Sequence, residues 1–77
     1  TRINVVKILK QRSEESKVSV RNVRRDAQEN IRKSEREGDF SEDESRRAMA
    51  ELQRITDQAI KTIDDQAIIK EKEIMQV

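Results

Sequence analysis

The 77-residue sequence contains neither cysteine nor histidine. Without cysteine the chain can form no disulfide and offers no thiol nucleophile, and without either residue it lacks the usual zinc ligands. The absence of histidine also removes the one side chain whose ordinary pKa lies near neutral pH. Disulfide scaffolds, cysteine-dependent enzymes and zinc domains are therefore excluded.

Proline is absent as well, and Gly38 and Phe40 are the only glycine and the only aromatic residue. A β-sandwich, a barrel or a glycine-rich phosphate loop is hard to build from such a composition, which leaves helices. No apolar run approaches the roughly 20 residues that cross a bilayer. The N-terminus also lacks the basic-then-apolar order of a signal peptide. We expect a soluble intracellular protein that makes no membrane contact.

Charged residues make up 43% of the chain, and hydrophobic residues make up 32%. Residues 1–37 hold eleven Lys or Arg against six Asp or Glu, whereas residues 38–77 hold six against ten. This asymmetry is typical of a protein whose first half meets a polyanion. It is equally consistent with two helices of opposite charge that attract each other.

The helical pattern has one clear break, at residues 38–41. Gly38 can adopt the left-handed conformation that closes a helix, and Ser41 with Glu44 matches the S-x-x-E capping box of a new helix. The sequence therefore predicts two long antiparallel helices, over residues 6–37 and 42–75, joined by a tight turn.

Apolar residues form one stripe on each predicted helix. The first stripe consists of Leu9, Val20, Val23, Ala27 and Ile31. The second consists of Met49, Leu52, Ile55, Thr56, Ala59, Ile60, Ile63, Ala67 and Ile74. The second stripe is too wide for one neighbour, and 77 residues are few for a self-sufficient core. We therefore predict an all-α fold, a long antiparallel helical hairpin that supplies two helices of a three-helix bundle.

A row of cations lies directly beside the apolar arc of the first helix. Its members are Lys10, Lys17, Arg21, Arg24, Arg25 and Arg32. Guanidinium groups at helical spacing suit a phosphate backbone, because each planar fork can bind two phosphate oxygens. The near absence of aromatic residues argues against reading of single-stranded bases. The alternative is a solvated basic face paired with acids such as Glu14 and Glu35.

Catalysis is not expected from this chain. The carboxylates of Asp64 and Asp65, and those of residues 42–44, are adjacent in sequence and fan out around a helix instead of converging on a substrate. Residues 42–44 complement the helix dipole better than they would bind a metal. We predict no enzymatic activity, no metal, no cofactor and no small-molecule substrate.

Several segments resemble the C-terminal part of the ribosome recycling factor family. The octapeptide VRNVRRDA at residues 20–27 is the most specific, and it is followed in the family's order by SED at 41–43, LQRITD at 52–57 and KEIMQV at 72–77. In that family these segments form two helices of the three-helix bundle called domain I.

The resemblance implies a function in translation, in the cytoplasm of a bacterium or in an organellar stroma or matrix. It implies binding to large-subunit rRNA across the tRNA sites and, with elongation factor G, splitting of the post-termination ribosome, with GTP hydrolysis left to that partner. Arg21 and Arg24 match family arginines that contact rRNA, and Arg25 lies beside them. We predict an rRNA-binding site formed by these arginines together with Lys17 and Arg32.

The resemblance also sets the expected domain boundaries. Residues 1–5 resemble the end of a strand that, in the family, returns from a smaller β-containing domain II. The family then has a link with two prolines and about three helical turns, which this chain lacks, so we expect residues to be missing between positions 5 and 6. Residues 6–77 are assigned to the helical hairpin. The competing hypothesis for function is a coiled-coil-like hairpin that pairs with proteins and binds no nucleic acid.

Overall fold

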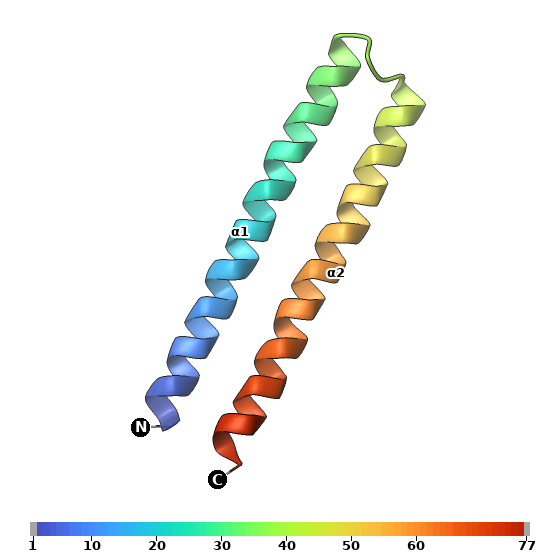
Figure 1. The fold of residues 1–77 in the computed structure, drawn as a ribbon. Helices are drawn as coiled ribbons and strands as arrows, with labels where there is room; N and C mark the ends of the chain where they lie inside the picture. The colour runs from blue at the N-terminus through green and yellow to red at the C-terminus, as the bar shows by residue number, and fades with distance from the viewer. Residues whose placement is uncertain (1, 77) are drawn as a thin grey trace.

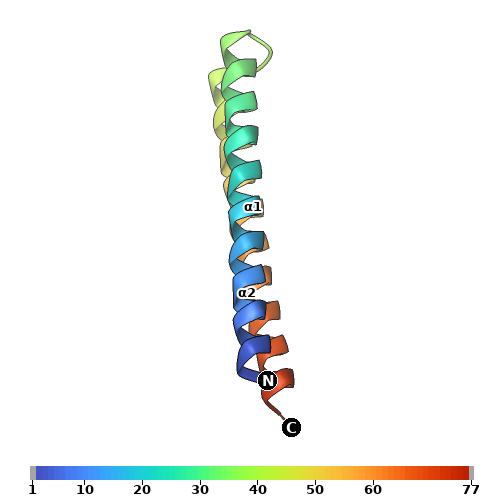
Figure 2. The same ribbon diagram turned by 90° about the vertical axis from the view of Figure 1, so that its left-hand side faces the viewer.

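The structure, a computed structural model, describes residues 2–76 and contains two helices. Helix α1 spans Arg2–Arg36 and helix α2 spans Glu42–Met75. They run antiparallel and side by side (Figure 1) and lie in a single layer when the molecule is turned (Figure 2), within an envelope of 58 × 15 × 9 Å. The predicted all-α hairpin is confirmed. No helix among the described residues is both long and apolar enough to cross a membrane.

The turn between the helices follows the predicted capping chemistry. Gly38 has a φ of 83°, and the Asp39 and Phe40 amides donate to the Ser34 carbonyl at 2.9 and 3.2 Å. Ser41 Oγ accepts from the Glu44 amide at 3.1 Å, and Glu44 Oε1 accepts from the Ser41 amide at the same distance. The left-handed glycine ends α1, and the capping box begins α2.

The first residues differ from the expectation of a strand remnant. Arg2 to Val5 form the beginning of α1, which runs without a break through Val5 and Val6, where we expected missing residues. Thr1, the first residue of the expected strand, lies outside the described residues. The assignment was wrong for residues 2–5 because nothing there interrupts a helix, and Val6 and Leu9 extend the half-buried side of α1.

The seam between α1 and α2 is thin, and its most buried residues are polar. No hydrophobic residue in the described part of the chain is buried, whereas Ser45 and Thr56 are, with 6% and 3% of their surface exposed. The Thr56 hydroxyl is satisfied within its own helix, because Oγ1 donates to the Leu52 carbonyl at 2.7 Å. Two helices in one layer therefore enclose little apolar surface, as expected for an incomplete bundle.

One face of the hairpin carries an apolar groove of about 320 Å³. The groove is lined by Ser19, Val20, Val23, Arg24, Leu52, Ile55, Thr56 and Ala59. Val23 and Ile55, which the stripes place among buried residues, are 66% and 52% exposed. They are exposed because each helix has only the other as a neighbour, which leaves one edge of each apolar stripe uncovered.

Candidate nucleic-acid interface

The five residues predicted to bind RNA lie along one helix, α1, but not in one environment. Arg21, Arg25 and Arg32 are exposed, whereas Lys17 and Arg24 are half-buried at the seam. Arg21, Arg24 and Arg25 fall within five residues, which is little more than one helical turn. The structure therefore brings three guanidinium groups together on a rigid element.

These three arginines carry charge that the hairpin does not neutralise. Within residues 2–76, no carboxylate lies within 4.0 Å of a nitrogen of Arg21, Arg24 or Arg25. Residues 16–25 contain no Asp or Glu, although 43% of the whole chain is charged, and Glu29, four residues after Arg25, is paired with Arg32 instead. We call residues 16–25 the acid-free window. Its arginines are available to an external anion.

Lys17 lies in the same window, but its ammonium already has two partners. Nζ is 2.8 Å from Asp64 Oδ1 of α2 and 2.9 Å from Glu14 Oε1, and the side chain is 14% exposed. The hydrogen bond to Asp64, followed by that to Glu14, raises the pKa of Lys17. A second link between the helices joins Lys10 to Glu71 at 3.9 Å. Lys17 thus connects the two helices.

Arg32 and Arg24 occupy the margins of the basic surface. Arg32 donates to Glu29 Oε1 at 3.1 Å in an exposed pair, and such pairs contribute only about 0–1 kcal/mol. Arg24 lines the apolar groove beside Val20 and Val23. In this position the aliphatic stem of Arg24 can cover apolar surface while its guanidinium group reaches outward.

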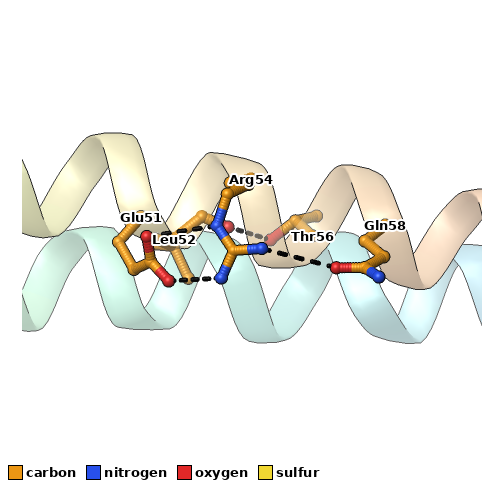
Figure 3. A network of polar contacts seen from close by, with 5 residues as sticks. All are labelled: Glu51, Leu52, Arg54, Thr56 and Gln58. Carbon is orange, nitrogen blue, oxygen red and sulfur yellow. Dashed lines mark hydrogen bonds and ion pairs between the residues drawn. The ribbon is translucent and has the colours of Figure 1, made fainter.

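Two arginines on α2, Arg54 and Arg46, contrast with those of the acid-free window. Arg54 donates to Glu51 through two nitrogens, with Nε 3.2 Å from Oε2, and to Gln58 at 3.5 Å (Figure 3). The hydrogen bond from Arg54 lowers the pKa of Glu51. Arg46 is paired with Glu42 and Asp43 in the same way. These surface cations are therefore partly neutralised by their own helix.

Carboxylates do not gather into a metal site. Across residues 2–76, no group of three or more Asp or Glu side chains is placed to hold an ion. The acids at the start of α2, residues 42–44, lie in its first turn, where they complement the helix dipole. Arg21, Arg24 and Arg25 of α1 remain the candidate site.

Comparison with known proteins agrees with the resemblance in the sequence. The family model "Ribosome recycling factor" matches residues 1–75. The ribosome-recycling factors of Symbiobacterium thermophilum and Bacillus subtilis are 50% and 47% identical to this chain over 99% of its length, and that of Natranaerobius thermophilus is 52% identical over 95%. The chain spans about two fifths of these relatives, 41%, 41% and 40% respectively. No solved structure gives a significant match. The chain belongs to the ribosome recycling factor family.

Proposed function

We propose that this hairpin is the part of a ribosome recycling factor that holds large-subunit rRNA, with Arg21, Arg24 and Arg25 bound to phosphates. The observation that supports the proposal most is the acid-free window, in which these three arginines have no carboxylate partner among the described residues. The complete factor would act in the cytoplasm with elongation factor G to split the post-termination ribosome.

The hairpin would contribute stiffness and charge to this process, not chemistry. A helix of 35 residues is about 52 Å long, so α1 is long enough to reach between distant sites on a ribosomal subunit. The arginines are fixed on that rod, and each fork can bind phosphate oxygens in a bidentate manner. GTP hydrolysis would belong to the partner protein, as the family resemblance implies.

Lys17 and Arg32 remain predicted RNA contacts, but each already has an acidic partner within the hairpin. Arg32 can exchange its exposed partner Glu29 for a phosphate at little cost, because the pair is screened by solvent. Lys17 would have to leave Asp64 and Glu14 first. We therefore expect the contribution of Lys17 to RNA affinity to be smaller than that of Arg21, Arg24 or Arg25.

The dependence of binding on salt tests the proposal. A full-length factor that contains this hairpin is titrated against purified large ribosomal subunits at several salt concentrations. An RNA-binding surface loses affinity steeply, because each neutralised phosphate releases a counterion.

The alternative is supported by a different observation, the uncovered apolar groove, which would suit a protein helix. Binding through that groove would be nearly insensitive to salt. A flat salt dependence would therefore contradict the RNA proposal and favour protein pairing.

A further inference from the structure

The outer surface of the acid-free window carries an apolar and an amide side chain in addition to its cations. Val18, Asn22 and Arg25 follow each other at spacings of four and three residues, which places them on one side of α1. All three are exposed, and Val18 is 50% exposed. The residues that face the other helix, such as Val20 and Arg24, are half-buried, so this line points away from the seam.

The Asn22 side-chain amide has no hydrogen-bond partner within residues 2–76. Gln11 offers a comparison, because it lies eleven residues earlier, three helical turns along the same side of α1. Its Nε2 donates to Glu15 Oε1 at 3.4 Å. Arg25 follows Asn22 by three residues, which places the two side chains next to each other on the surface of α1.

The chemistry of this line is that of a nucleotide contact. A carboxamide both donates and accepts hydrogen bonds, as does the ribose 2′-hydroxyl. Folded RNA displays these hydroxyls in a wide and shallow minor groove, with phosphates along both edges. The outward side of α1 presents this carboxamide with the guanidinium groups of Arg25 and Arg21 to one side of it, and exposed Val18 can pack against a sugar.

We propose that Asn22 is a specificity-determining residue that hydrogen-bonds a ribose 2′-hydroxyl of folded RNA, while Arg21 and Arg25 hold the adjacent phosphates. This inference rests on the proposed function, since it requires α1 to lie on RNA. It adds that the surface distinguishes RNA from other polyanions. Charge alone cannot do so, because phosphate contacts carry no information about the sugar.

Two measurements on the full-length factor with purified large subunits test the inference. The first compares the affinity and salt slope of the wild type, Asn22→Ala, Arg24→Ala and the control Gln11→Ala. We expect Asn22→Ala to bind about 3- to 10-fold more weakly, the range for one neutral hydrogen bond, with an unchanged salt slope. Arg24→Ala should reduce the slope by about one, and Gln11→Ala should bind like the wild type.

The second measurement maps 2′-hydroxyl acylation of the rRNA with and without each variant. The wild type should protect a cluster of riboses, and Asn22→Ala should lose protection at one or two of them while the others stay protected. Wild-type affinity and an unchanged protection map for Asn22→Ala, beside a weakened Arg24→Ala, would overturn the role of Asn22 alone. A wild-type factor with no salt dependence and no protection would overturn the proposed function as well.

Discussion

Arg24 separates the two candidate functions most sharply at the scale of single residues. In the full-length factor, Arg24→Ala should weaken binding to large subunits by about 1 to 3 kcal/mol, because a charge-assisted contact is lost. Helix content should not fall, since alanine is the better helix former. Arg24→Lys should recover only part of the affinity, because an ammonium keeps the charge but not the fork.

Binding at two salt concentrations, beside circular dichroism, measures both effects of the Arg24 substitutions. If Arg24→Ala binds like the wild type and only melts earlier, the residue acts through its stem in the groove and not through phosphate. Arg46→Ala is a suitable control, because that exposed arginine is already paired with Glu42 and Asp43 on α2.

Helical periodicity was enough to predict which cations share a surface, but not which of them are already paired with a carboxylate. The acid-free window could be read from residues 16–25, because the relevant neighbours are local. The partner of Lys17 could not, because Asp64 lies 47 residues away and meets it only when the hairpin forms. The burial of Val23 was overestimated for a similar reason, since a stripe does not say how many neighbours will cover it.

At the scale of the elements, the Lys17–Asp64 pair links α1 to α2. Asp64→Asn should lower the melting temperature of the full-length factor by a few degrees, because the half-buried ammonium keeps only Glu14 as an ionic partner. The exchange of both charges, Lys17→Glu with Asp64→Lys, should recover part of the loss. If Asp64→Asn melts like the wild type, the pair does not hold the helices together.

The same pair predicts a dependence of stability on pH. Hydrogen bonds to Asp64 and Glu14 raise the pKa of Lys17, so the folded state binds this proton more tightly than the unfolded state. The contribution is fully present below the ordinary lysine value of about 10.4 and is lost as the pH rises through the raised value. The difference in melting temperature between wild type and Lys17→Met should stay constant from about pH 6 to 9 and shrink above about pH 10.4. A difference that shrinks below pH 9 would contradict this assignment.

The turn gives a prediction that rests on backbone conformation alone. Gly38 has a φ of 83°, and a Cβ added there would meet no atom within 4 Å. Gly38→Ala should therefore destabilise the hairpin by about 1 to 2 kcal/mol through left-handed strain. Gly38→Asn should cost less, because asparagine tolerates this conformation. Equal stabilities of the two variants in chemical unfolding would show that the turn relaxes into another conformation.

For the whole molecule, the sequence predicted the hairpin, its turn and an apolar surface that no further helix covers. All three follow from local periodicity and capping. It failed at residues 2–5, where a resemblance to a strand outweighed a continuous helical pattern. The second stripe is wider than the surface that α1 covers, and its uncovered part forms one side of the groove lined by Val23 and Ile55. A chain with no fully buried hydrophobic residue among those described cannot draw much stability from its own core.

The isolated 77-residue chain should accordingly be weakly helical when dilute and should associate as its concentration rises. Association would cover the groove, and burial contributes about 25 cal/mol per Å² of apolar surface removed from water. Circular dichroism and sedimentation over a wide concentration range measure both properties. The double variant Val23→Glu and Ile55→Lys should stay monomeric, whereas Val18→Lys, on the outward side of α1, should associate like the wild type. Sharp melting that does not depend on concentration would instead show that two helices suffice, because the thin seam would then be stable without any cover.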